Sequence, residues 1–137
     1  MNWLKGSWRT GAQISLEKYH PDRVEAVSLV RMVRSFEEVK TAIRAQHGED
    51  PEVVLTDARP IPNALSYAAY RQVLLDPQRS KKPILLVFGT GWGISDSFYP
   101  EVDRILAPVY GPEGVEGDNH LSVRSAVAII LDRLFGQ

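Results

Sequence analysis

The chain contains no cysteine among its 137 residues. Disulfide bonds, thiolate metal sites and cysteine nucleophiles are therefore excluded. A strong charge of either sign is also missing, because 16 basic and 17 acidic side chains leave a formal net charge of −1. No overall attraction toward nucleic acid or an anionic membrane surface is expected, although a local basic patch remains compatible with this balance.

Long apolar runs and a recognisable leader are missing as well. No stretch approaches the roughly 20 apolar residues that cross a bilayer, and the first residues, Met-Asn-Trp-Leu-Lys-Gly, lack the apolar core of a signal peptide. We expect a soluble cytoplasmic protein that uses neither a membrane nor a metal. The 44% of hydrophobic and 24% of charged residues are ordinary for a globular domain. A chain of this length suffices for one domain with a real core.

Residues 1–23 follow no clear helical or strand period. Aromatic residues stand among basic ones here, a mixture that can stack on nucleic-acid bases. With three basic residues between positions 5 and 18, the tryptophans are better explained as covering the edge of the core or a partner. His20 precedes Pro21 and is thereby disfavoured from a helix. We predict an irregular or linker segment over 1–23 and an α/β domain over 24–137.

From residue 24 onward, predicted strands alternate with predicted helices. Apolar and β-branched runs predict strands over 26–33, 52–56, 83–88 and 104–107. Helical spacing and capping signals predict helices between Ser35 and Gly48, over 66–75 and from Ser122 to Leu134, with a short helix from Ser95. The alternation favours a parallel sheet with helices on both faces. The continuous apolar run at 83–88 predicts a strand that is covered on both sides.

Three loops are expected at the carboxyl edge of this sheet, where such folds bind ligands: 56–59, 89–93 and 107–121. The glycines at 89, 91 and 93 match neither the dinucleotide fingerprint nor the P-loop, and alone they favour a tight turn over a ligand site. Ser122 is predicted to cap the last helix. The small residues at its start would let a flat ligand or another backbone approach closely.

Residues 85–93, 105–108 and 119–126 resemble, in order and spacing, the three C-terminal motifs of SPOUT-superfamily RNA methyltransferases. The nearest likeness is to a bacterial branch with a SAM-dependent RNA methyltransferase domain, and residues 19–23 with 25–26 resemble it too, so the likeness covers most of the chain. It implies an α/β fold with a C-terminal trefoil knot, a rare feature. It also implies S-adenosylmethionine (SAM) bound in the knot, a homodimer, and an RNA substrate, either tRNA or rRNA.

Carried over by position, the resemblance implies a set of cofactor-binding residues in three groups: Gly89, Thr90, Gly91 and Gly93; Ile105, Leu106 and Pro108; His120, Leu121, Ser122 and Ser125. Methyl transfer needs an aligned acceptor and, for some acceptors, removal of a proton. The polar residues near the predicted pocket are Asp57, Arg59, Asp118, Asn119 and His120. No general base can be named among them, and a hydrogen-bonded loop role for His120 is at least as well supported as a catalytic one.

The chain departs from the family at its start. Members usually begin with a strand–helix–strand unit that carries a basic residue near the substrate, and here residues 3–19 stand in its place. A fragment and a naturally short form both remain open. So do three functions: an RNA methyltransferase, a SAM-binding or dimerising module without activity of its own, and an unrelated α/β domain that binds a nucleotide or anion at the same loops.

Overall fold

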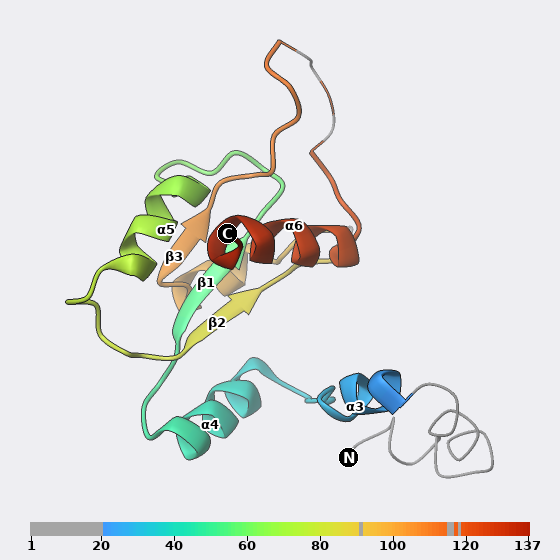
Figure 1. Ribbon diagram of the computed structural model, residues 1–137, viewed down its shortest axis with the longest axis vertical. Coiled ribbons are helices and arrows are strands. Elements are labelled where there is room, and N and C mark those ends of the chain that lie inside the picture. Colours follow the sequence, from blue (N-terminus) through green and yellow to red (C-terminus); the bar gives the residue numbers. More distant parts are fainter. Residues whose placement is uncertain (1–20, 91, 115–116, 118) are drawn as a thin grey trace. The chain divides into compact units, whose positions relative to one another are not determined.

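The computed structural model describes residues 21–90, 92–114, 117 and 119–137 (Figure 1). The chain divides into two compact units, Met1–Ala42 and Ile43–Gln137. The division falls within helix α4 (Phe36–His47), later than the boundary after residue 23 that the sequence predicts. That boundary stays a prediction, and each unit is described here by itself.

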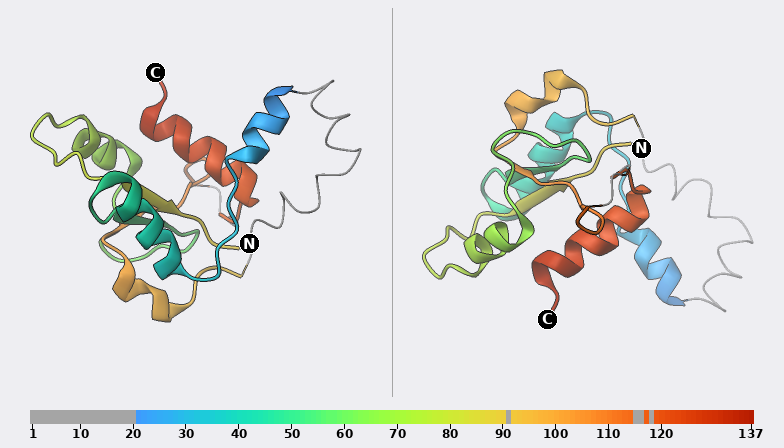
Figure 2. Two further views of the ribbon diagram at one scale, coloured as in Figure 1. Left: turned by 90° about the horizontal axis from the view of Figure 1, so that it is seen from below. Right: turned by 90° about the horizontal axis from the view of Figure 1, so that it is seen from above.

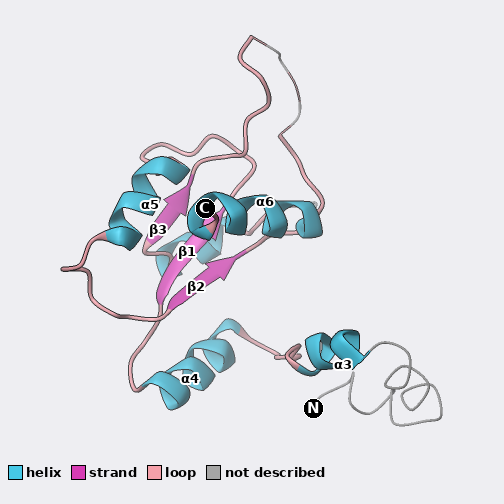
Figure 3. Ribbon diagram, viewed as in Figure 1, coloured by secondary structure: helices cyan, strands magenta, loops and turns pink. Residues whose placement is uncertain are grey.

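The first unit contains helix α3 (Pro21–Ser28) and the beginning of α4. Residues 26–28 belong to α3 and residues 30–33 form neither helix nor strand (Figure 3), so the predicted strand over 26–33 is wrong. Residues 21–23, predicted to be irregular, are helical. Pro21 at the first helical position and Asp22 in the first turn both favour a helix here. A strand also needs a neighbour for its backbone groups, and the described part of this unit contains no strand.

Helix α4 begins and ends where the sequence predicts. The Glu38 amide donates to Ser35 Oγ at 3.2 Å, and the Glu38 carboxylate accepts from the Arg34 amide at 3.0 Å. The first bond is the one expected when a hydroxyl precedes a carboxylate by three residues, while the carboxylate binds the amide before Ser35 instead of the Ser35 amide itself. Gly48 ends the helix with a φ of 80° and donates its amide to the Arg44 carbonyl at 2.8 Å. Glycine adopts this left-handed conformation without a side-chain clash, which explains the stop.

The second unit is built on a three-stranded parallel sheet with the strand order β2-β1-β3. Each of the three strands lies within a segment that its apolar residues predict to be a strand, and helical elements alternate with the strands as expected. The elements in chain order are β1 (Glu52–Thr56), α5 (Tyr67–Leu75), β2 (Ile84–Val87), the 3₁₀ helix η1 (Asp96–Glu101), β3 (Arg104–Leu106) and α6 (Val123–Phe135). The predicted α/β class is confirmed.

The core of this unit lies between the sheet and the helix pair α5 and α6. Val54 of β1 packs there with Tyr70 from α5, Leu106 from β3, and Ile130 and Leu134 from α6. Ile130 and Leu134 are the two buried residues of α6, so the helix meets the sheet with this side. Figure 2 shows α6 and η1 on opposite sides of the sheet in both views, so helical segments flank both of its faces.

The most buried strand is β1 rather than β2. Residues 53–55 of β1 are buried, whereas all four residues of β2 are only half-buried. The prediction that 83–88 is covered on both sides is therefore wrong. The cause is position, because β1 lies between two strands while β2 lies at the edge of the described sheet.

Backbone and side-chain bonds fix the segments that follow β3. Leu65, just before α5, donates to the Ile105 carbonyl at 2.8 Å and accepts from the Ala107 amide at 2.7 Å. Tyr67 Oη then donates to the Ala107 carbonyl at 2.8 Å. Ser122 caps α6 as predicted, because its Oγ accepts from the amide of Ser125 at 3.2 Å. Hydrogen bonds to Leu65 and Tyr67 therefore hold the end of β3, and the Ser122 cap holds the start of α6.

Candidate functional site

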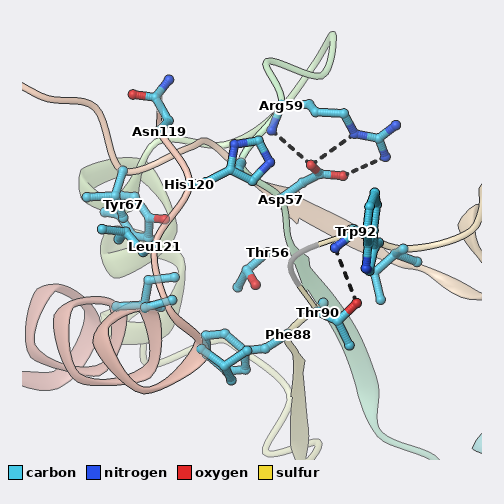
Figure 4. A pocket seen from close by; sticks show the side chains of 18 residues that line it. Thr56, Asp57, Arg59, Tyr67, Phe88, Thr90, Trp92, Asn119, His120 and Leu121 are labelled. Atoms are coloured by element: carbon cyan, nitrogen blue, oxygen red, sulfur yellow. Dashed lines mark hydrogen bonds and ion pairs between the residues drawn. The ribbon is translucent and has the colours of Figure 1, made fainter. Parts of the chain in front are cut away.

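A cavity of about 490 Å³ lies at the carboxyl edge of the sheet (Figure 4). Its walls come from residues 56–59 after β1, from 88–90 and 92–94 after β2, and from Val109 and 119–121 between β3 and α6. Residues of α5 and α6 complete it from the core side. The predicted convergence of the three loops is therefore confirmed. Strands that run parallel all end at one edge, which is why loops far apart in sequence meet there.

Five of the residues that the resemblance assigns to the cofactor line this cavity: Gly89, Thr90, Gly93, His120 and Leu121. Ile105, Leu106, Pro108, Ser122 and Ser125 are not among the residues that line it. Leu106 is instead fully buried in the core, and Ser122 is engaged in capping α6. Gly91 lies outside the described residues. The cofactor roles of all these residues stay predictions.

The turn after β2 is closed by its own hydrogen bonds. The Gly93 amide donates to the Thr90 carbonyl at 2.9 Å, and the Trp92 amide lies 3.4 Å from Thr90 Oγ1. Gly93 has a φ of 79°, which a residue with a side chain rarely adopts. A Cβ added at Gly89 would lie 3.2 Å from the Gly93 carbonyl carbon and 3.2 Å from Ile94 Cγ1. Gly93 is thus needed for its backbone conformation, and Gly89 for the close approach of the two sides of the turn.

The polar wall of the cavity is organised around Asp57, whose side chain is 5% exposed. Its carboxylate accepts from the Arg59 amide at 2.9 Å, from Arg59 Nε at 3.2 Å and Nη2 at 3.0 Å, and from Tyr99 Oη at 2.7 Å. The Arg59 guanidinium also donates to Tyr99 Oη and lies 5.9 Å from the centre of the Tyr99 ring. These three side chains form one hydrogen-bonded cluster, in which Asp57 fixes the guanidinium.

Opposing effects act on the pKa of Asp57. Burial by itself would raise it, but the hydrogen bonds from Arg59 and Tyr99 and the charge of Arg59 outweigh burial and hold the pKa below its ordinary value. The hydrogen bond to Asp57 raises the pKa of Arg59. Burial, and then the hydrogen bond to Asp57, raise the pKa of Tyr99. Near neutral pH the cluster therefore consists of a carboxylate, a guanidinium and a neutral phenol.

The variant Asp57→Asn is expected to lower the free energy of unfolding at pH 7 by about 1–3 kcal/mol, because the donors of Arg59 and Tyr99 lose a buried, charged acceptor. A lowered carboxyl pKa contributes stability above the unfolded-state value of about 3.9, and this contribution is lost as the pH falls through the folded-state pKa. The difference between wild type and variant should therefore shrink in acid. Denaturant unfolding at a series of pH values measures it.

Asp96→Asn is the matched control for this variant. It removes a carboxylate that is 91% exposed and lies 3.9 Å from Arg59. Exposed pairs of this kind contribute little, so a change within about 0.5 kcal/mol is expected. A destabilisation by Asp57→Asn that stayed constant into strong acid would contradict the role of its charge.

Sequence reasoning found part of this wall and missed the rest. Asp57, Arg59, Asn119 and His120 were expected near the pocket as polar candidates, and all four line it; Asp118 lies outside the described residues. Tyr99 was missed because it comes from η1, 40 residues after Arg59, and no periodic pattern links the two. Trp92, which also lines the cavity, was given no role from the sequence.

No group of three or more His, Asp or Glu side chains that could hold a metal ion occurs in the described part of the chain. No helix within it is long and apolar enough to cross a membrane.

Comparison with known proteins shows which family the chain belongs to. Residues 2–136 match the family described as SAM-dependent RNA methyltransferase. The chain belongs to this family. The description of this family agrees with the predicted enzyme class and with the predicted cofactor, SAM.

Curated relatives extend this finding. An uncharacterized protein of Aquifex aeolicus is 46% identical over 121 residues, which are 88% of this chain and 56% of the relative. A tRNA (guanine-N(1)-)-methyltransferase of Oleidesulfovibrio alaskensis is 37% identical over 136 residues, 99% of this chain and 29% of the relative. A protein of the same name from Nitratidesulfovibrio vulgaris is 39% identical over 117 residues, 85% of this chain and 25% of the relative. The chain thus spans about half of the first relative and about a quarter of the other two.

The cavity fits the cofactor of the family. Its volume of about 490 Å³ lies within the range of about 300–1,000 Å³ that is typical of small-molecule sites. Phe88, Val109 and Leu121 offer apolar surface, and Asn119 and His120 add polar groups. An adenosyl group has the matching character, with flat apolar faces and hydrogen-bonding edges.

Proposed function

We propose that this chain binds SAM in the cavity and transfers the methyl group to a nucleotide of RNA, with tRNA as the substrate class. The observation that supports this is the meeting of the glycine turn after β2 with residues 119–121 before α6 around one cavity. The names of two relatives favour tRNA over rRNA. Their matched parts are 29% and 25% of their lengths, so the guanine N1 atom is not carried over to this chain.

The chemistry asked of the chain is mainly positional. SAM, when bound, supplies a methyl group that is already activated by its sulfonium. Phe88, Val109 and Leu121 would enclose the adenosyl group, while the backbone of Gly89 and Thr90 would supply hydrogen bonds to it. Alignment of the acceptor with the S–CH₃ bond then lowers the barrier without covalent help from the protein.

Asp57 is better suited to positioning than to proton removal. Both of its carboxylate oxygens accept hydrogen bonds from Arg59 or Tyr99. Its lowered pKa makes it a weak base near neutral pH. We therefore assign Asp57 the role of holding the Arg59 guanidinium at the cavity wall, and we leave the base for the acceptor unassigned.

Calorimetry with SAM and with its demethylated product tests the cofactor site. Saturable binding of both by the wild-type chain is expected, and its absence would contradict the proposal. Methyl transfer from radiolabelled SAM to tRNA and rRNA transcripts then tests the activity. Binding without transfer to either RNA would favour a SAM-binding module or a part of a larger methyltransferase, which the short coverage of the relatives keeps open.

The SPOUT arrangement, with a C-terminal trefoil knot and a homodimer, is a further part of this proposal. The motif likeness supports it, as does the position of the cavity between the glycine turn and the start of α6. Residues 115, 116 and 118 of the loop that would form the knot lie outside the described residues. A cytoplasmic location goes with an RNA substrate and stays a prediction.

Helix α6 carries the surface that we propose for the dimer. Val123, Val127, Leu131 and Phe135 recur every four residues and form one row along the helix, with Leu131 at 41% and Phe135 at 57% exposed. An exposed apolar row of this kind is typical of a contact surface.

Sedimentation of the wild-type chain is expected to give a dimer, and the double variant Leu131→Asp with Phe135→Asp is expected to be a monomer, because charges would be buried without partners. Leu75→Asp on α5, which is also strongly exposed, is the control and should leave the dimer intact. A dimeric double variant, or a monomeric wild type, would rule out this surface.

A further inference from the structure

Trp92 is the most exposed large apolar side chain among the described residues. It is 99% exposed although it stands at the rim of a cavity and on a turn that its own hydrogen bonds hold closed. An indole left in water forgoes the free energy of burying one of the largest apolar side chains. The turn therefore holds this ring in solvent, in the position that a binding partner would cover.

A fixed cation lines the same cavity. The Arg59 side chain is 47% exposed, and its Nε and Nη2 donors are directed to Asp57. Its Nη1 lies only 3.9 Å from Asp96, but that carboxylate is 91% exposed and the pair is correspondingly weak. Figure 4 shows Trp92 and Arg59 among the side chains that line the pocket, with the Asp57 carboxylate bonded to the guanidinium. Arg59 thus offers an oriented, partly free guanidinium edge in the same cavity as an exposed aromatic ring.

We propose that Trp92 and Arg59 form the RNA subsite of this enzyme, in which one base stacks on the Trp92 indole and an adjacent phosphate binds the Arg59 guanidinium. This inference rests on the proposed function, because it names where that RNA binds. Stacking on an exposed aromatic ring is the usual way in which proteins hold an unpaired base, and arginine is suited to phosphate. This subsite is also compatible with a net charge of −1, because RNA affinity would come from one aromatic and one cationic side chain rather than from a basic surface.

Binding of an unmodified tRNA transcript to the full chain, saturated with S-adenosylhomocysteine, tests the subsite. Trp92→Ala is expected to weaken RNA binding about 5- to 150-fold, as loss of one base stack does, while Trp92→Phe retains most of the affinity. Arg59→Ala is expected to weaken it uniformly and to reduce the slope of log Kd against log salt by about 1. Trp92→Ala should leave that slope unchanged. Arg44→Ala removes an exposed arginine that does not line the cavity and serves as the charge control.

A second measurement observes the ring directly. The chain has three tryptophans, so Trp3→Phe with Trp8→Phe leaves Trp92 as the only one. Guanosine monophosphate, which carries one base and one phosphate, should quench its fluorescence saturably, and Arg59→Ala should shift the midpoint upward. This readout does not depend on transfer activity, and variants at so exposed a position are expected to fold as the wild type does.

The outcomes separate this inference from the function on which it rests. A wild-type chain that binds no SAM contradicts the proposed function itself. A chain that binds SAM normally but binds RNA equally well with and without the Trp92 ring overturns the subsite alone. Loss of SAM affinity in Trp92→Ala, with RNA affinity unchanged, also overturns it and makes Trp92 a wall of the cofactor site. Failure of the wild type to bind either the transcript or guanosine monophosphate overturns it as well.

Discussion

Replacing Gly89 with valine should weaken SAM binding at least about 100-fold while the sheet and α6 remain folded. A Cβ at this position already meets the Gly93 carbonyl carbon and Ile94 Cγ1 at 3.2 Å, and valine adds two methyl groups at the wall of the cavity. The turn must move or the side chain must enter the cavity. Either change removes backbone and volume from the proposed cofactor site, and a loss of about 2.7 kcal/mol corresponds to this factor.

Gly111→Val is the matched control for this experiment. Gly111 does not line the cavity, and a Cβ there meets nothing within 4 Å. Its SAM affinity, measured by the same calorimetry, should stay within about twofold of the wild type. Circular dichroism should show the same helix content for both variants. A Gly89→Val chain that binds SAM normally would place the cofactor elsewhere.

The second large effect is expected at Leu106, where two assignments conflict. The resemblance makes it a cofactor residue, whereas its side chain is fully buried in the core beside Tyr70 and Ile130. Leu106→Ala is expected to lower the free energy of unfolding by about 2–5 kcal/mol, through lost burial and the cavity left behind. Chemical denaturation measures this change.

Calorimetry on the folded fraction of the same variant decides between the two roles. If Leu106 acts only through the core, SAM affinity stays near that of the wild type once the temperature is low enough to keep the variant folded. Leu75→Ala, which removes the same atoms from an exposed position, should change stability by less than about 0.5 kcal/mol. A stable Leu106→Ala chain with weak SAM binding would restore the cofactor role.

Elements with local signals could be predicted from the sequence. The capping pair Ser35 and Glu38, the cap at Ser122 and the stop at Gly48 each depend on groups a few residues apart, and each is present in the structure. The segment 26–33 shows the limit of this approach. Its β-branched residues favour a strand, but a strand forms only beside a neighbouring strand. The local sequence does not show whether such a neighbour is present.

The site divides in the same way. The edge at which the three loops meet follows from the alternation of strands and helices, so Gly89, Asp57 and His120 could be expected together. The Asp57–Arg59–Tyr99 cluster could not, because Tyr99 arrives from η1 through the three-dimensional path of the chain. The exposure of Trp92 could not be predicted from the sequence either, because burial depends on which segments pack around a side chain in the folded protein.

By itself, the sequence determined the α/β class, most helix and strand positions, the likeness to the methyltransferase family and the edge of the sheet that carries the site. These depend on periodicity, capping and motif order, which act over short distances along the chain. The tertiary structure alone decided that β1 is the buried strand, that Leu106 belongs to the core and that Tyr99 bonds to Asp57 and Arg59 of the cavity wall. Those outcomes depend on which distant segments become neighbours, and the free energy of burial and of buried hydrogen bonds is settled only there.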